Sequence, residues 1–320
     1  MPQHSPDPMD NRLPPPQAVL ARAGSENFPV ALRLLGRNEQ RHLMAVYGFA
    51  RLVDDIGDEV EPVSARGAAL DWVEDELERA AVGRATHPLF VDLGRAIAGA
   101  GLPLQPLHDL VAANRLEQLV SQYRTYDQLL GSCELSANPV GRLVLAIFGV
   151  SRPDRVAYSD DVCTGLQIVE HLQDVGEDAR RGHVYLAEED RETFGCSVDA
   201  LLAPLAGVPL RNLVADYGRR ARALLGAAVP LARGLPARPK LAIAAFAAGG
   251  LAALDAIEAA GNDVLGVTCR PKPRRVAVHA ARIASGVPER ALSRWARSVP
   301  TTVARASHRR PAGATGQVAG

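Results

Sequence analysis

The stretch DDVCTGLQIVEHLQDVGEDARRGHVYL, residues 160–186, carries carboxylates at helical spacing. An α-helix turns by about 100° per residue, so Glu170, Asp174 and Asp178 follow one another along a single helix face. Like charges one turn apart repel each other, and a buried carboxylate without a partner costs several kcal/mol. If this face points into the protein, a cation must therefore neutralise it.

A second acidic stripe lies nearer the N-terminus, in RHLMAVYGFARLVDDIGDE, residues 41–59. The pattern predicts a helix that ends near Gly57. One face of this helix starts apolar and ends in Asp54 and Asp58, with Cβ atoms about 5–6 Å apart, whereas Asp55 points elsewhere. The alternative is a helix that simply emerges from the core into solvent at this point. The spacing does not match a calcium-binding loop.

The two acidic stripes together indicate a metal site more strongly than either stripe does alone. Facing each other, they would form an oxygen-only site of the kind that binds Mg²⁺. Such an acidic site attracts an anionic diphosphate through bridging metal ions, and Arg51, Arg180 or Arg181 could bind the remaining phosphate charge. In the alternative interpretation, Arg180 and Arg181 neutralise the second stripe directly as salt bridges.

Helical periodicity extends over most of the chain and predicts an all-α fold. No run of alternating β-branched residues indicates a sheet. The apolar run 241–254 is too short to span a bilayer and predicts a buried, closely packed helix. A further helix is expected at roughly 273–298. The other expected helices are 39–57, 66–81, 104–121, 138–149, 154–179, 209–232 and 239–260.

Charged residues are distributed unevenly along the chain, although Lys plus Arg and Asp plus Glu both total 36. Residues 268–320 hold 11 basic residues and one acid, which leaves 25 basic and 35 acidic residues, a net charge of −10, in the rest. We therefore expect a Pro-rich disordered segment at 1–24, an acidic folded body, and a basic, largely flexible tail at 268–320.

Composition also limits the partners and the compartment. The four cysteines show no metal-ligand spacing, and the N-terminus has no apolar signal region, so we expect a cytoplasmic protein with reduced thiols. The tail holds one aromatic residue, Trp295, and no recognisable module, so nucleic-acid binding is not expected. A loose attraction of the tail to anionic lipid, at the inner face of the membrane, is the more economical prediction.

Four segments together resemble the squalene/phytoene synthase family of head-to-head isoprenoid synthases. The resemblance covers roughly residues 25–267 and implies that they form the catalytic domain, a single all-α isoprenoid synthase (terpenoid synthase) bundle with a central cavity. SANPVG and ENFPVALRLL most resemble the hopanoid-pathway branch of squalene and hydroxysqualene synthases (HpnC type). The segments are SENFPVALRLL (25–35), YGFARLVDDIGD (47–58), SANPVG (136–141) and LQIVEHLQDVGEDARRGHVYL (166–186).

The resemblance also implies roles for individual residues. It implies three Mg²⁺ ions held with the substrate diphosphate between the two acidic motifs, and Glu170 stands where the family often has Asn. The implied metal ligands are Asp54, Asp58, Glu170, Asp174 and Asp178. The implied catalytic residues are Tyr47, Arg51, Phe28, Gln167 and Tyr185, and the implied substrate-binding residues are Ser25, Asn27, Arg51, Arg181 and Asn138.

For the hopanoid branch, the resemblance implies conversion of presqualene diphosphate to hydroxysqualene, or squalene, with release of diphosphate. NADPH is not expected, and a separate presqualene diphosphate synthase is an expected functional partner. Asn138 could orient the attacking water, or could only begin a helix before Pro139. The alternatives are a presqualene diphosphate, dehydrosqualene or phytoene synthase acting on farnesyl or geranylgeranyl diphosphate, and, more remotely, a non-catalytic helical scaffold.

Overall fold

The computed structural model describes residues 16, 19, 35–60 and 62–287 of the chain. Within these residues all regular structure is α-helix or short 3₁₀-helix, and pairing between extended segments is limited to one isolated bridge between Gln122 and Val184. The all-α prediction is therefore confirmed for this part of the chain.

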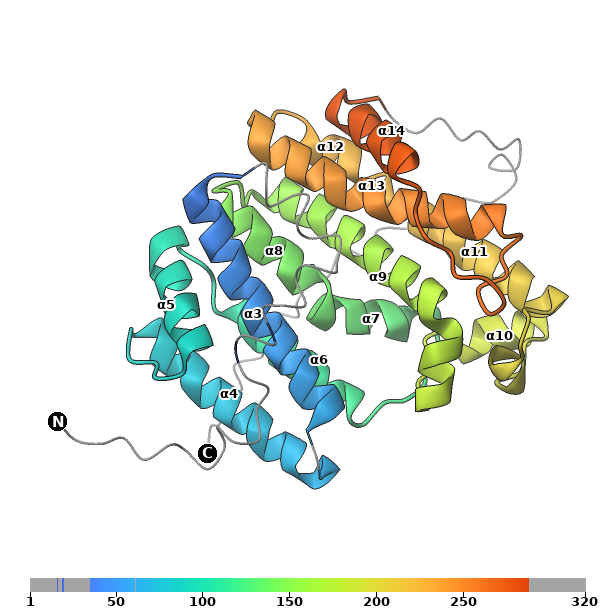
Figure 1. Cartoon of the computed structure of the whole chain (residues 1–320), viewed down its shortest axis with the longest axis horizontal. Coiled ribbons are helices and arrows are strands. Elements are labelled where there is room, and N and C mark those ends of the chain that lie inside the picture. The colour runs from blue at the N-terminus through green and yellow to red at the C-terminus, as the bar shows by residue number, and fades with distance from the viewer. Residues whose placement is uncertain (1–15, 17–18, 20–34, 61, 288–320) are drawn as a thin grey trace, which may run out of the picture. The chain divides into compact units, whose positions relative to one another are not determined.

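Figure 1 shows how the helices are arranged. The α-helices are α3 (Arg37–Glu59), α4 (Arg66–Ala81), α5 (Pro88–Ala100), α6 (Gln105–Glu117), α7 (Tyr126–Ser136), α8 (Asn138–Ile147), α9 (Pro153–Arg181), α10 (Glu188–Phe194), α11 (Val208–Leu225), α12 (Ala228–Ala232), α13 (Ala237–Ala259) and α14 (Pro273–Ala284). Two 3₁₀-helices, η1 (Val63–Ala65) and η2 (Asp199–Leu202), complete them.

The seven helices expected before residue 268 are all found, with one difference. The segment 209–232 forms two helices, α11 and α12, with a turn at Gly226 and Ala227 between them. The reason is Pro230, which has no backbone N–H to donate to a continuous helix but fits the first turn of a new one. The helices α5, α7 and α10 add to the expected set.

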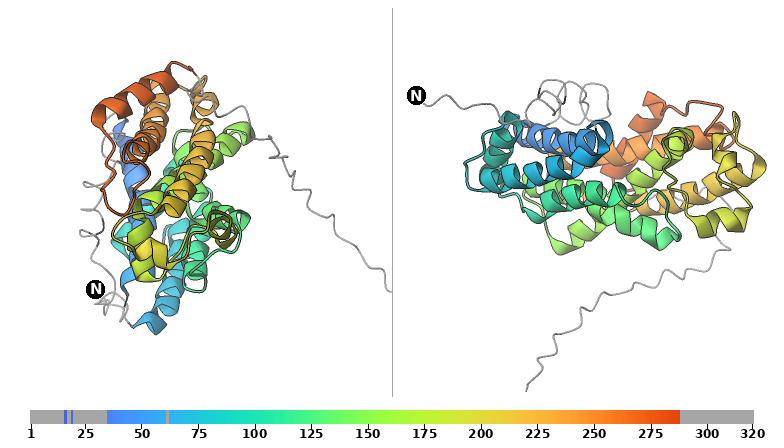
Figure 2. Two further views of the ribbon diagram at one scale, coloured as in Figure 1. Left: turned by 90° about the vertical axis from the view of Figure 1, so that its right-hand side faces the viewer. Right: turned by 90° about the horizontal axis from the view of Figure 1, so that it is seen from below.

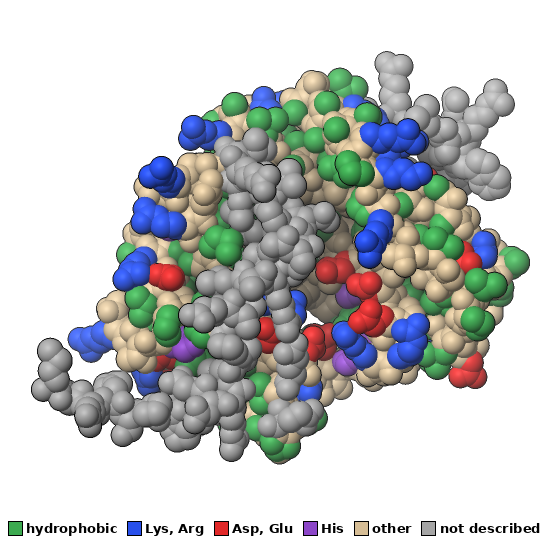
Figure 3. Space-filling model, viewed as in Figure 1, with side chains coloured by type: hydrophobic (Ala, Val, Ile, Leu, Met, Phe, Trp, Pro, Cys, Tyr) green, Lys and Arg blue, Asp and Glu red, His purple; other side chains and the backbone are tan. Residues whose placement is uncertain are grey.

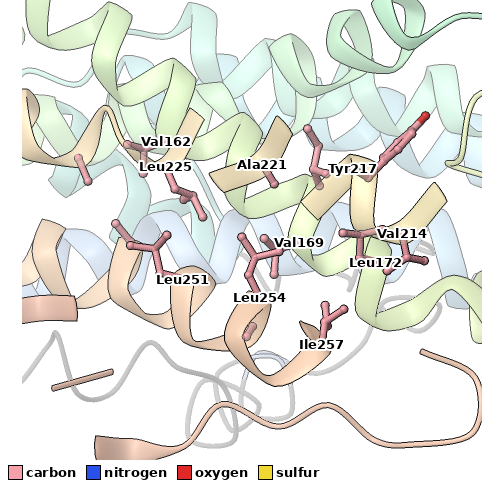
Figure 4. Close-up of a cluster of buried hydrophobic side chains, with 14 of the residues drawn as sticks. Val162, Val169, Leu172, Val214, Tyr217, Ala221, Leu225, Leu251, Leu254 and Ile257 are labelled. Carbon is pink, nitrogen blue, oxygen red and sulfur yellow. The ribbon is translucent and has the colours of Figure 1, made fainter. Parts of the chain in front are cut away.

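Two hydrophobic clusters hold the helices together. One is formed mainly by α3, α4, α5 and α6, where Phe49 meets Phe90 edge to face with ring centroids 5.8 Å apart. The other surrounds α9, α11 and α13 (Figure 4). Figure 2 shows that α3 to α6 lie to one side and α11, α13 and α14 to the other, so the clusters fix the two acidic helices α3 and α9 separately.

Helix α13 contains the apolar run that we expected to be buried. It is long and apolar enough to cross a membrane, but 67% of its most apolar window is buried within the protein. The helix packs against α9, α11, α12 and α14. It is therefore a core helix, and its many alanines allow these neighbours to approach closely.

The folded unit extends beyond residue 267, where composition placed a boundary. Helix α14 packs on α13, and His279 Nε2 lies 2.9 Å from Asp255 Oδ2 between the two helices. The helix ends at Ala284, earlier than the predicted 298. The predicted disordered N-terminal segment, apart from Pro16 and Val19, and the last part of the predicted tail lie outside the described residues.

We expect the α9–α11–α13 cluster to dominate the stability of its half of the fold. Leu254 is 2% exposed on α13, so Leu254→Ala should lower the free energy of unfolding by about 3 kcal/mol through lost contacts and a new cavity. Leu241→Ala on the same helix, where Leu241 is 43% exposed, should cost less than about 1 kcal/mol. Urea unfolding followed by circular dichroism measures both. Equal losses would contradict this packing.

Candidate active site

The C-terminal half of α3 separates its acidic residues as the periodicity predicts. Asp54 and Asp58 are exposed, whereas Asp55 is 1% exposed and turned into the protein. Asp55 Oδ1 lies 2.8 Å from Nε of Arg51, one turn earlier on the helix. The buried carboxylate therefore anchors the guanidinium that was expected to bind diphosphate, and leaves Asp54 and Asp58 to form the acidic face.

Asp54 is reached by solvent, yet protein surrounds it on most sides. The pKa of Asp54 is raised to about 7, mainly by this desolvation and to a smaller extent by the charges of Asp58 and Glu117. A hydrogen bond from Asn114 Nδ2 to Asp54 Oδ1, at 3.2 Å, and the charge of Arg51 lower the pKa of Asp54 and oppose these effects. A cation bound beside a carboxylate in such surroundings would stabilise its ionised form.

The approach of α6 to α3 depends on Gly57. A Cβ atom at this position would lie 2.2 Å from Oδ1 of Asn114, far too close for any side chain. Gln118 Nε2 also donates to the Gly57 carbonyl oxygen at 3.1 Å. The glycine within the first acidic motif thus allows α6 to bring Asn114 against Asp54.

The second acidic motif lies in the C-terminal half of α9. Glu170 and Asp174 are exposed and Asp178 is half-buried. The pKa of Asp178 is raised to about 7, first by desolvation and second by the charge of Asp174, and desolvation likewise raises the pKa of Asp174. The packing of α9 therefore holds like charges close together in partly desolvated surroundings.

The alternative in which neighbouring arginines neutralise this stripe does not match the observed ion pairs. Arg181 Nη2 lies 2.8 Å from Glu177 and pairs with that residue instead of Asp174 or Asp178. Its charge lowers the pKa of Asp174 and Asp178 only from a distance. Among the described residues, neither aspartate forms an ion pair within 4.0 Å.

Glu117, at the end of α6, connects the two motifs and was not predicted. Its carboxylate accepts a hydrogen bond from the hydroxyl of Tyr185. Its charge raises the pKa of both Asp54 on α3 and Asp178 on α9. Nothing in the sequence marks Glu117, because it has no second carboxylate at helical spacing, and only the packing of α6 brings it to the site.

Tyr185 lies in an aromatic stack beside the second motif. Its ring is parallel to that of His171, with centroids 3.7 Å apart, and stacks more loosely on Tyr123 at 6.0 Å. Burial lowers the pKa of His171 to about 3, so the imidazole is neutral at physiological pH. Gln167 Nε2 lies 3.5 Å from His171 Nε2. Two predicted residues, Tyr185 and Gln167, are thus joined through a histidine that was not predicted.

The remaining predicted residues fall into three groups. Tyr47 is half-buried on α3, on the helix that carries the first motif. Asn138 is buried at the start of α8, where its Oδ1 accepts a hydrogen bond from Thr164 of α9 at 3.0 Å, so it ties two helices together. Ser25, Asn27 and Phe28 lie outside the described residues.

The donors fit a hard divalent cation that also binds a phosphate ligand. Figure 3 shows Asp and Glu side chains around a hollow on the face that carries α3 and α9. Within the described part of the chain, no three His, Cys, Asp or Glu side chains form a ready-made metal cluster. Oxygen-only donors on two separate helices, with pKa values raised by crowding and desolvation, suit Mg²⁺ ions that complete their shells with phosphate oxygens and water.

Comparison with known proteins identifies the group to which these motifs belong. The model of the squalene/phytoene synthase family matches residues 21–282. The chain belongs to the squalene/phytoene synthase family. It is therefore an enzyme of the isoprenoid synthase type, as the paired motifs and the helical fold predict.

Two hydroxysqualene synthases are similar in sequence to this chain. The protein from Rhodopseudomonas palustris is 36% identical over 210 residues, which cover 65% of this chain and 70% of the relative. The protein from Zymomonas mobilis is 33% identical over 203 residues, covering 62% and 67%. The similarity to these two proteins extends over about two thirds of each chain.

Solved structures confirm the isoprenoid synthase fold. Squalene synthase HpnC from Alicyclobacillus acidocaldarius is 40% identical, with a TM-score of 0.71 over 76% of this chain and 92% of that one. A dehydrosqualene synthase bound to a ligand has a TM-score of 0.73 over 87% and 98% of the two chains. At 22% identity, this second structure supports the fold alone.

The raised pKa values of Asp54 and Asp178 predict that ionisation of these two groups destabilises the metal-free protein. Between pH about 4 and 7, an unfolded aspartate releases its proton while folded Asp54 and Asp178 retain theirs, so the stability of the metal-free protein falls as pH rises. Asp54→Asn and Asp178→Asn should therefore raise the melting temperature of the metal-free protein at pH 8 by a few degrees, and change it little at pH 4. Calorimetry with a chelator present measures this.

The matched control for these variants is Asp92→Asn. Asp92 is on the surface, where its side chain is 58% exposed and pairs with Arg95. This variant should not become more stable than the wild type at pH 8. A lower melting temperature for both site variants at pH 8 would contradict the proposed charge crowding.

The contact between Glu117 and Tyr185 predicts a non-additive effect on activity. Glu117→Ala and Tyr185→Phe should each lower kcat about tenfold or more, because each removes the hydrogen bond that holds the Tyr185 ring beside the second motif. The double variant should lose little more than either single variant. Steady-state kinetics of the wild type, the two single variants and the double variant measure this double-mutant cycle. Additive losses would show that the two residues act independently.

Proposed function

We propose that this enzyme converts presqualene diphosphate to hydroxysqualene with release of diphosphate, in a Mg²⁺-dependent reaction. The observation that carries the proposal is the pair of carboxylate faces on α3 and α9, which Glu117 brings into electrostatic contact. The two relatives described as hydroxysqualene synthases and the 40% identical squalene synthase structure support this choice of substrate and product.

The metal ligands would be Asp54 and Asp58 on one helix, and Asp174 and Asp178 on the other. Glu170 lies one turn before Asp174 and supplies a further carboxylate on the same side. Bound Mg²⁺ neutralises the diphosphate and makes it a better leaving group. The raised pKa values of Asp54 and Asp178 support this assignment, because a nearby cation removes the charge repulsion and offsets the desolvation that cause them.

Arginines would bind the phosphate charge that the metal ions leave. Asp55 holds Nε of Arg51 and so fixes the guanidinium one turn before the first motif, where its charge can act on the diphosphate. Arg181 already exerts its charge on the second motif and could serve from the opposite side. Fixed donors of this kind stabilise charge as it develops on the leaving group.

Aromatic faces would stabilise the carbocation that remains when diphosphate leaves. Tyr47 and Phe28 could each contribute up to about 2 kcal/mol through their π faces. Tyr185 is held in position by its hydrogen bond to Glu117 and its stack on neutral His171. An uncharged imidazole does not repel the cation. A single admitted water then adds its oxygen to the cation and loses a proton, which gives the alcohol.

This assignment carries further expectations about cellular context. The reaction as written consumes no reductant, so NADPH is not required. A separate presqualene diphosphate synthase would supply the substrate, and hopanoid biosynthesis would use the product. The enzyme would work in the cytoplasm, at the inner face of the membrane, where its substrate and product partition.

Product analysis tests the proposal. Purified enzyme with Mg²⁺ and presqualene diphosphate should yield hydroxysqualene equally with and without NADPH, as identified by mass spectrometry. Asp58→Asn and Asp174→Asn should each lower kcat at least a hundredfold, because each removes a metal ligand, whereas surface Asp92→Asn should retain activity.

Other products would reassign the enzyme within its family. Squalene formed only with NADPH, or dehydrosqualene or phytoene from farnesyl or geranylgeranyl diphosphate, would replace the proposed reaction. No product from any of these substrates would contradict the catalytic role of the two carboxylate faces.

A further inference from the structure

The short segment 182–187 joins α9 to α10 and carries Tyr185 beside the second acidic motif. Two kinds of contact hold the Tyr185 ring. Its hydroxyl donates to Glu117, and the backbone around it is hydrogen-bonded to neighbouring elements. On one side, the backbone N–H of Val184 donates to the carbonyl oxygen of Ser121, in the loop between α6 and α7, at 2.8 Å. The position of the ring therefore depends on the backbone of this segment as well as on Glu117.

Tyr217 of α11 holds the other end of the segment. This tyrosine is 1% exposed, and Figure 4 shows it at the edge of the apolar cluster with its hydroxyl turned away from the other labelled side chains. The backbone N–H of Ala187 donates to the Tyr217 hydroxyl oxygen at 2.9 Å, and the hydroxyl donates to Asp190 Oδ2 at 2.9 Å. Burial raises the pKa of Tyr217, so this hydroxyl keeps its proton. One hydroxyl thus ties the segment 182–187 to both α10 and α11.

Arg220 of α11 in turn fixes both Tyr217 and Asp190. Its guanidinium donates to the two carboxylate oxygens of Asp190, at 3.0 and 2.8 Å. The same group lies over two aromatic rings, 4.4 Å from the centroid of Tyr126 and 5.2 Å from that of Tyr217. A bidentate ion pair constrains the orientation of both partners, and a cation–π contact attracts the guanidinium to the ring face. The acceptor of the Ala187 N–H is therefore held by a polar network as well as by apolar packing.

Loss of the Tyr217 hydroxyl would leave a buried backbone N–H without its acceptor. Ala187 is 0% exposed, so the chain must move before water can replace the hydroxyl. Ala187 follows Tyr185 by two residues, and a shift of the backbone at Ala187 therefore moves the Tyr185 ring. A displacement of about 1 Å at a reacting centre can lower the rate about a hundredfold. The Tyr217 hydroxyl thus influences the site by way of the backbone.

We propose that Tyr217 is a positioning residue for the reaction, whose hydroxyl sets the place of the Tyr185 ring beside the second acidic motif through the backbone of Ala187. Tyr217 needs no contact with the substrate for this role. The role rests on the proposed function only in that Tyr185 takes part in the turnover of a prenyl diphosphate. It holds equally for presqualene, farnesyl and geranylgeranyl diphosphate.

Kinetics of diphosphate release test this role in the full-length enzyme, with Mg²⁺ and whichever of these three substrates the wild type consumes. Tyr217→Phe should lower kcat about tenfold and change KM less than about twofold, because the carboxylates on α3 and α9 are unaltered. In a Tyr185→Leu enzyme, which has no ring to position, the same change should lower kcat no further. Hydrogen exchange followed by mass spectrometry should show faster exchange in the peptide that contains residues 182–187.

The matched control is Tyr126→Phe, which removes a hydroxyl from the second ring that contacts Arg220. The Tyr126 hydroxyl is buried and, within the part of the chain that the structure describes, has no hydrogen-bond partner. This variant should keep the wild-type kcat and the wild-type exchange rate in residues 182–187. Leu254→Ala controls for a general loss of stability, and it should keep the wild-type kcat at temperatures well below its melting temperature.

Unchanged kcat in Tyr217→Phe would overturn the proposal, even if exchange in residues 182–187 became faster, because the hydroxyl would then serve stability alone. An equal fall in kcat with and without the Tyr185 ring would also overturn it, since Tyr217 would act by another route. Failure of the proposed function gives a different result. The wild type would then release diphosphate from farnesyl or geranylgeranyl diphosphate but not from presqualene diphosphate, and the effect of Tyr217→Phe should persist.

Discussion

Desolvation of the carboxylates on α3 and α9, with their mutual repulsion added to it, is the constraint around which this molecule is organised. Asp54 and Asp178 belong to different helices, and each has its pKa raised to about 7, mainly by desolvation. The charge of Glu117 acts on both. The fold tolerates this cost because two large hydrophobic clusters stabilise the helices independently of the site. A divalent cation bound together with diphosphate would neutralise these carboxylates, so relief of their desolvation and repulsion would favour binding.

Close helix approach is the means by which the fold imposes this arrangement. Gly57 lets α6 come against α3, so that Asn114 and Glu117 reach the first and second motifs from a third helix. Gly176 lets the loops beyond α9 pack on its outer side. A side chain at either glycine would push a neighbouring element away. The position of the carboxylates thus depends on residues that carry no charge.

The sequence predicted those parts of the site that follow from helical periodicity. Asp54 and Asp58 share a face while Asp55 turns inward, because 100° per residue decides this within one helix. It could not predict Glu117 or His171, because their roles depend on which helices meet. For the fold, periodicity gave the helices but not the break between α11 and α12, where Pro230 interrupts a continuous apolar pattern. Composition placed the end of the folded unit before α14, since a basic helix packed by Ile283 and His279 resembles a polar tail.

The central claim is that the carboxylates of α3 and α9 act as one site that is completed by metal and diphosphate together. Differential scanning calorimetry with Mg²⁺ and an unreactive prenyl thiodiphosphate, added separately and then together, tests it most directly. We expect a large rise in melting temperature only when both are present, and loss of that rise in Asp54→Asn and in Asp178→Asn alike. Full stabilisation by either addition alone, or a rise that survives in one of the two variants, would contradict it.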